Sequence, residues 1–243
     1  KNDYAPGCFP PGILLGATFN KEVVHAVGEA LGAEADLFGV DILLGTPNVN
    51  IHRDPLNGRL FEGYSEDPCL VSELAPELVK GVQKFGVAAN VKHFAANNQE
   101  FNRNNNNSHI SERTLREIYL KGFEITIKEA NPKAIMTSYN LINGVHTSES
   151  YELINDILRC EWKYDGLVMT DWIASGRSFC KKSKYNAPYA SKSILSGNDL
   201  TMSGCPADYK DIMKALKKGK LSRTDLIYSA SRVYRSILRQ KSK

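Results

Sequence analysis

Short apolar runs alternate with amphipathic stretches along most of this sequence, and that alternation constrains the possible folds more than any other feature. Five runs end in glycine, proline or polar residues and have the length of buried strands. They cover 40–45, 87–94, 133–140, 166–172 and 198–204, with 13–19 as a candidate sixth. Helical spacing of apolar residues predicts helices over 21–38, 74–82, 115–123, 153–158 and 226–238. Strands apolar on both faces that alternate with helices indicate parallel βαβ units.

Polar residues follow the ends of the predicted strands, and their position separates a barrel from an open sheet. Lys92 and His93 end the second strand, Tyr139 the third and Asp171 the fourth. In an α/β barrel the carboxyl ends of all strands converge on one face, where active sites lie. The chain has 243 residues, close to the size of one barrel, and no glycine-rich phosphate-binding motif. We therefore expect a (β/α)8 TIM-type barrel that forms a single domain over 1–243.

Charge and composition exclude several classes of function. The 31 basic and 27 acidic side chains give a net charge of +4 without a basic run, so no nucleic-acid partner is expected. No apolar stretch approaches the thickness of a bilayer, so no membrane partner is expected either. Five widely spaced cysteines without a CxxC pair predict reduced thiols rather than a disulfide framework or a zinc site. A cytoplasmic location is the expectation, and secretion stays open because the sequence begins without Met.

The segment GLVMTDW, at 166–172, carries an apolar run up to one carboxylate and places an indole directly behind it. A carboxylate is costly to remove from water unless it has partners. Asp171 is therefore either paired or held in place for chemistry.

Five longer motifs make the sequence recognisable. They are NVNIHRDPLNGRLFEGYSEDP, VKHFAANNQE, ISERTLREIYLKGFE, IMTSYNLINGVH and LRCEWKYDGLVMTDW. In this order, from about Phe9 to the end of the chain, they resemble the N-terminal domain of glycoside hydrolase family 3, and within it most closely the β-glucosidases. The resemblance implies an exo-acting, retaining hydrolase of β-D-glucosides or short β-glucan oligosaccharides. It implies a covalent glycosyl-aspartate intermediate, no cofactor and no metal.

The resemblance also assigns roles to individual residues. Asp171 stands in the family's Ser-Asp-Trp motif, with Thr170 for the serine, and is implied as the nucleophile. A retaining glycosidase needs such an ionised carboxylate about 5–5.5 Å from a protonated one. Lys92 and Arg59 are expected to pair with Asp171 from neighbouring strand ends, which would keep it ionised. The implied substrate-binding residues are Arg59, Lys92, His93, Met136, Tyr139 and Trp172.

Several of these residues also have a plainer interpretation. Asp171 can be a structural residue that caps the loop after its strand, Lys92 a lysine in a salt bridge and His93 a packed histidine. Arg59 can form an ion pair with Glu62 or Glu66, and Met136 can belong to the core because it alternates inward on its strand. Glu100 and Arg103 are expected to brace a loop.

Two parts of the family pattern are expected to lie outside this chain. The general acid of family 3 β-glucosidases belongs to a second α/β domain, and the opening barrel strand would precede Lys1. We therefore expect an incomplete barrel from a larger enzyme. The remainder of the parent polypeptide, or a partner chain, would supply the second domain.

Other functions remain open on the sequence alone. A β-N-acetylhexosaminidase is disfavoured because AANNQEFNR lacks the glycines and the Asp-x-His pair of those relatives, and Trp172 disfavours a β-xylosidase. Lys92 could instead form a Schiff base in an aldolase-type barrel. A truncated sugar-binding domain without turnover is the non-catalytic alternative.

Overall fold

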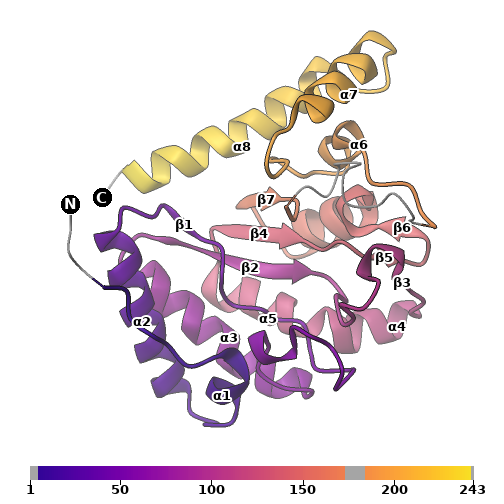
Figure 1. Cartoon of the computed structure of the whole chain (residues 1–243). Coiled ribbons are helices and arrows are strands. Elements are labelled where there is room, and N and C mark those ends of the chain that lie inside the picture. Colours follow the sequence, from indigo (N-terminus) through magenta and orange to yellow (C-terminus); the bar gives the residue numbers. More distant parts are fainter. Residues whose placement is uncertain (1–4, 173–183, 242–243) are drawn as a thin grey trace.

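A four-stranded parallel sheet forms the centre of the computed structural model, which describes residues 5–172 and 184–241. Its strands lie in the order β1-β2-β4-β7 (Figure 1). The register places Ile42 opposite Ala88, Asn90 opposite Ala134, and Ala134 opposite Leu167. The strands are β1 (Ile42–Leu43), β2 (Ala88–Phe94), β4 (Ala134–Thr137) and β7 (Leu167–Met169). Because all four run in one direction, the loops after them meet at one edge of the sheet.

Long helices cover one face of this sheet (Figure 1). The side chain of Asn20 caps the helix that begins at Lys21 by accepting hydrogen bonds from two backbone N–H groups. The side chain of Asp67 caps the helix that begins at Pro68 by accepting one from the Cys69 N–H. Apolar residues of these helices pack with Phe94 and Val91 of the sheet in the larger core cluster. The helices are α2 (Lys21–Leu37), α3 (Pro68–Gln83), α5 (Lys121–Ala130) and the π-helical η5 (Glu152–Glu161).

The opposite face of the sheet carries a second, smaller cluster. Met136 and Met169 pack there with Met202, and Val233 of the last helix lies against them. Figure 1 shows this helix crossing above the sheet, with two shorter helices beside it. They are α6 (Ala190–Leu195), α7 (Pro206–Lys217) and α8 (Arg223–Lys241).

The remaining elements are short and lie between the main ones. A small sheet pairs β3 parallel to β5, and β5 antiparallel to β6. Its strands are β3 (Asn107–Ser108), β5 (Leu141–Ile142) and β6 (Val145–His146). The short helices are α1 (Gly12–Gly16), η1 (Leu60–Glu62), η2 (Arg103–Asn105), α4 (Glu112–Thr114), η3 (Leu115–Tyr119) and η4 (Thr147–Glu149).

The candidate sixth strand at 13–19 is wrong, since this segment begins with helix α1. A short apolar run does not distinguish a strand from a helix. Packing decides here, because Leu15 is buried and Gly16 approaches the Tyr64 carbonyl so closely that a Cβ atom would clash with it.

The predicted strand at 198–204 is also wrong, because only Leu200 forms a bridge, to Met169. Backbone hydrogen bonds still join this segment to the end of β7. The Asp199 N–H donates to the Val168 carbonyl at 2.7 Å, and the Thr170 N–H donates to the Leu200 carbonyl at 3.0 Å. Side chains add further contacts. Asn198 donates to the Ser148 carbonyl at 2.7 Å, and Asp199 accepts the Val168 N–H at 2.9 Å.

The predicted apolar stripe of the last helix is only partly buried. Val233 reaches the smaller cluster, but Ile227 is 51% exposed and Tyr234 62% exposed. Only the side of α8 that faces the sheet is covered.

The sheet does not close into a complete barrel within residues 5–172 and 184–241, because β1 and β7 form its two edges and do not pair. In the same residues, no helix combines the length and apolar character needed to cross a membrane. The cysteines that the structure describes are free thiols; Cys180 lies outside the described residues.

Candidate active site

Asp171 lies two residues beyond β7 and is almost completely buried, with 5% of its surface exposed. Its Oδ1 atom accepts the Trp172 N–H at 2.7 Å. Its Oδ2 atom has no hydrogen-bond partner of standard geometry among the described residues, and His93 Nε2 lies 3.7 Å away. Buried acceptors rarely stay unpaired. This oxygen is therefore available to a bound molecule.

His93 and Lys92 end strand β2 and bring two further side chains to this edge of the sheet. The side-chain amide of Asn50 fixes the backbone there. Its Nδ2 donates to the His93 carbonyl at 3.0 Å, and its Oδ1 accepts the Asn97 N–H at 3.0 Å. Burial, reinforced by Arg59, Lys92 and other positive charges, lowers the pKa of His93 well below its ordinary value. The imidazole is therefore neutral, and its contact with Asp171 is not an ion pair.

Arg59 and Lys92 share one carboxylate. Arg59 donates to Glu62 in the bidentate geometry, with Nε–Oε1 at 2.7 Å and a terminal nitrogen 2.8 Å from Oε2. Lys92 Nζ lies 3.5 Å from the same Oε2. Burial alone would raise the pKa of Glu62, but the two cations outweigh burial and lower it. The plainer interpretation of Arg59, an ion pair with Glu62, is thus correct as far as the protein contacts go.

The expected direct pairing of Asp171 with these two cations is wrong. Neither lies within 4.0 Å of it among the ion pairs of the described residues, because Glu62 holds both. Burial raises the pKa of Asp171; the Trp172 N–H and the more distant charges of Arg59 and Arg103 only partly oppose the rise. The site therefore holds a carboxylate whose ionised form is costly.

Tyr139 connects a loop arginine to the backbone beside Asp171. The guanidinium of Arg103 lies over the Tyr139 ring, 4.2 Å from its centre, a stacked cation–π arrangement. The Tyr139 hydroxyl donates to the Trp172 carbonyl. Arg103 also binds Glu100 at 2.9 Å, as the loop-bracing interpretation expects. Its position against Tyr139 gave no signal in the sequence, because it depends on how two distant loops meet.

The other two predicted substrate residues differ in their surroundings. Met136 is 3% exposed and packs in the smaller core cluster, which agrees with its interpretation as a core residue. Trp172 is 50% exposed, so its indole has a free surface for a ligand. The structure thus brings Arg59, Lys92, His93, Tyr139, Asp171 and Trp172 to one edge of the sheet.

This edge of the sheet combines side chains that can bind a polar ligand with one carboxylate that can react with it. Ammonium, guanidinium and imidazole groups can donate to hydroxyl groups, and the exposed indole offers an apolar face of the kind that contacts a sugar ring. Within the described residues, no group of three His, Cys, Asp or Glu side chains is placed to hold a metal ion.

Comparison with known proteins gives a consistent result. The family model described as "Glycosyl hydrolase family 3 N terminal domain" matches residues 3–236. A β-glucosidase of Rhizobium radiobacter is 44% identical over 227 residues, which are 93% of this chain and 26% of that protein. An exo-α-(1→6)-L-arabinopyranosidase of Bifidobacterium longum is 51% identical over 165 residues, 68% of this chain and 22% of that protein.

A solved structure matches nearly the whole chain. β-Glucosidase 3B of Thermotoga neapolitana, in complex with glucose, is 40% identical with a TM-score of 0.86, and the match covers 98% of this chain and 33% of that one. The predicted fold class, an α/β barrel that is incomplete in this chain, is confirmed by this match. The chain spans between about a fifth and a third of the length of these three proteins.

Proposed function

Because this chain belongs to glycoside hydrolase family 3, we propose that it is the nucleophile-bearing domain of a retaining β-glucosidase, with the domain spanning 1–243. The observation that carries the proposal is the buried Asp171. Among the described residues its Oδ2 has no hydrogen-bond partner of standard geometry, and it lies beside side chains of the types that bind sugars. Family relatives that act as β-glucosidases support the substrate class.

The proposed reaction has two displacement steps at the anomeric carbon. In the first, Asp171 Oδ2 forms a bond to this carbon while the bond to the leaving oxygen breaks and a general acid gives that oxygen a proton. In the second, water attacks the same carbon, the Asp171 ester bond breaks, and the proton of the water passes to the group that acted as acid. Arg59, Lys92, His93 and Tyr139 would hold the hydroxyls of the glucosyl ring, and Trp172 its apolar face.

We place the general acid outside this chain. Glu62, the carboxylate that joins Arg59 to Lys92, has a lowered pKa and is therefore a poor proton donor. Glu100 is already paired with Arg103. The relatives are about three to four times as long as this chain, which leaves ample sequence for a second domain. That domain, in the parent polypeptide or in a partner chain, would carry the acid.

An α-L-arabinopyranoside is the second candidate substrate, because a relative that is 51% identical over 165 residues is an exo-α-(1→6)-L-arabinopyranosidase. An arabinopyranoside lacks the hydroxymethyl group of glucose. Comparison of kcat/KM for matched aryl β-D-glucopyranosides and aryl α-L-arabinopyranosides identifies the substrate that the site prefers.

Labelling with an activated 2-deoxy-2-fluoroglucoside tests the proposal in the full-length protein. The fluorine slows the second step, so the glycosyl-enzyme accumulates and can be weighed and digested. We expect one fluoroglucosyl group on the peptide that contains Asp171. A label on another residue would refute the assignment, and glucose binding without any labelling or turnover would select the non-catalytic alternative. Borohydride trapping of a carbonyl substrate on Lys92 would select the Schiff-base mechanism.

Replacement of Arg103 by glutamine should shift the acidic limb of the pH–activity profile to higher pH. The nucleophile must be ionised, and the positive charge of Arg103 opposes the rise in the pKa of Asp171 that burial causes. Loss of that charge raises this pKa further, so activity falls at a higher pH on acidification.

The pH dependence of kcat/KM measures this shift. Arg103→Lys keeps the charge and should restore the limb. Arg113→Gln is the matched control, because Arg113 is exposed and pairs only with Glu117 among the described residues. A limb unchanged in Arg103→Gln, or shifted equally in the control, would contradict the prediction.

A further inference from the structure

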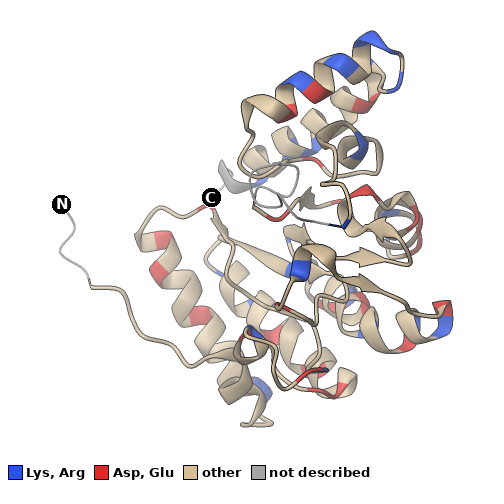
Figure 2. Cartoon of the chain, turned by 45° about the vertical axis from the view of Figure 1, so that its right-hand side comes forward, with Lys and Arg blue, Asp and Glu red and all other residues tan. Residues whose placement is uncertain are grey.

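A basic pocket lies between α6 and α7, and none of its lining residues belongs to the candidate active site. Its volume is about 490 Å³, in the range of about 300–1,000 Å³ that small-molecule sites occupy. Four lysines line it, against the single carboxylate of Asp211. Figure 2 shows basic residues gathered on α7 and on the turn that follows it.

The negative charges near the pocket are already engaged. Asp211 accepts the backbone N–H of Ser191 at 2.9 Å, and Glu149 lies 3.4 Å from Lys192. Lys192 also lies over the Tyr189 ring, 5.1 Å from its centre.

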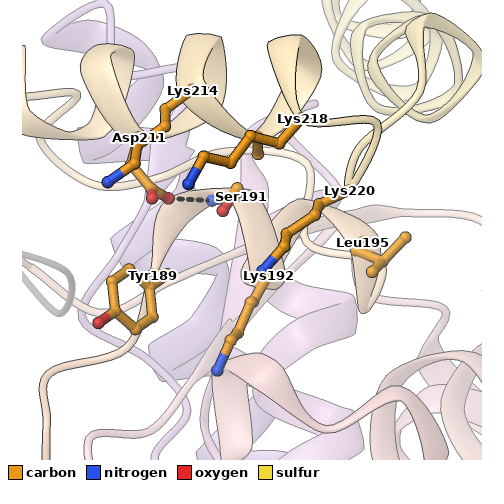
Figure 3. A pocket seen from close by; sticks show the side chains of 9 residues that line it. Tyr189, Ser191, Lys192, Leu195, Asp211, Lys214, Lys218 and Lys220 are labelled. Carbon is orange, nitrogen blue, oxygen red and sulfur yellow. Dashed lines mark hydrogen bonds between the residues drawn. The ribbon is translucent and has the colours of Figure 1, made fainter.

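Three ammonium groups remain without an ion pair to any residue that the structure describes. Lys214 lies in the last turn of α7, Lys218 is the residue that caps this helix, and Lys220 follows on the turn before α8. In Figure 3 the side chains of Lys214 and Lys218 end on either side of the Asp211 carboxylate, while Lys220 extends toward α6. Like charges four positions apart, as Lys214 and Lys218 are, repel one another. An anion with several charged groups could pair with all three, whereas a singly charged anion could not.

Part of the pocket lining is apolar. The Tyr189 ring, Leu195 and Ala215 form it. Apolar walls with a few converging charges are typical of sites for small organic ligands.

We propose that this pocket binds a small polyanion that carries at least two phosphate or carboxylate groups. Lys214, Lys218 and Lys220 would bind the anionic groups, and Tyr189 and Leu195 would contact the body of the ligand. This site is independent of the proposed glucosidase chemistry, and it needs no residue of the candidate active site.

Calorimetric titration of the full-length protein with pyrophosphate, and separately with citrate, tests the proposal. The titrations are made at low ionic strength, because exposed charges are screened over about 10 Å at 0.1 M salt. The double variant Lys214→Gln/Lys218→Gln should weaken binding about tenfold, since each exposed pair contributes a factor of roughly 1.5–5. Binding of pyrophosphate alone would identify phosphate groups as the ligand chemistry, and binding of citrate alone would identify carboxylates.

The matched control is Lys210→Gln/Lys217→Gln, which removes the same charge from α7 at positions that do not line the pocket. We expect the control to bind as the unmodified protein does. All four lysines are exposed, so both variants should fold, and circular dichroism checks this. No heat with either anion in the unmodified protein, or equal weakening in both double variants, would overturn the proposal.

Discussion

The variant Asp171→Gly should lose roughly 10⁴- to 10⁶-fold in kcat toward an aryl β-glucoside, the range found when a covalent nucleophile is removed from an enzyme. Asp171 has the only site oxygen, among the described residues, that is buried, carboxylic and without a standard hydrogen bond. Steady-state kinetics on the full-length protein measure the loss. Azide should partly restore turnover, because it can occupy the space of the missing carboxylate and attack the anomeric carbon itself.

Product configuration and stability separate this loss from damage to the fold. The rescued product should be a glucosyl azide of α configuration, since azide attacks once from the side of the missing carboxylate. Because burial makes the ionised form of this carboxylate costly, the variant should unfold at no lower temperature than the unmodified protein. Asp165→Asn, a change at an exposed aspartate that pairs with Arg239, should retain full activity. Turnover in Asp171→Gly within tenfold of the unmodified protein would refute the nucleophile role.

The largest effect on stability is expected at Asp199, whose side chain is completely buried. Arg159 donates to its Oδ2 at 2.8 Å, and Arg232 of α8 donates to its Oδ1. Val168 of β7 donates its N–H to the same carboxylate at 2.9 Å. One acid thus joins η5, β7 and α8. Asp199→Ala would leave two guanidinium groups without their partner.

We expect Asp199→Ala to cost about 3–5 kcal/mol in the free energy of unfolding, as breaking a buried ion pair does. In a chain of this size that corresponds to a fall in Tm of about 6–20 °C. Asp165→Ala is the matched control, since it removes an Asp–Arg pair of 2.7 Å that is about half exposed, and such pairs contribute about 0–1 kcal/mol. Calorimetric unfolding compares the two. Equal losses in both variants would show that the buried network stabilises no more than a surface pair.

The sequence predicted the four strands of the main sheet and the convergence of their ends, and the reason is visible at β2 and β7. Both have apolar residues on both faces and end in polar residues. Each pairs parallel to β4, which lies between them, so their carboxyl ends lie at the same edge of the sheet. There His93 Nε2 is 3.7 Å from Asp171 Oδ2. The family match confirms the recognition made from the motifs.

The predicted pairing of Asp171 with Arg59 and Lys92 was wrong, because the prediction considered the nearby charges and not the burial of the carboxylate. Arg59 and Lys92 do approach the site, but Glu62 takes up both, and the loss of water around Asp171 decides the direction of its pKa shift. The role of Arg103 against Tyr139 was missed for a related reason. A contact between two loops 36 positions apart has no periodic signal in a sequence.

The carboxylate of Glu62 has a consequence for how this site can evolve. Since it serves two cations at once, a change at Arg59 alters the surroundings of Lys92, and the reverse holds as well. Mutational effects within such a shared network are not additive. A substitution at one of these three positions leaves a charged side chain at another without its partner. We therefore expect Arg59, Glu62 and Lys92 to be replaced together in relatives that prefer a different sugar.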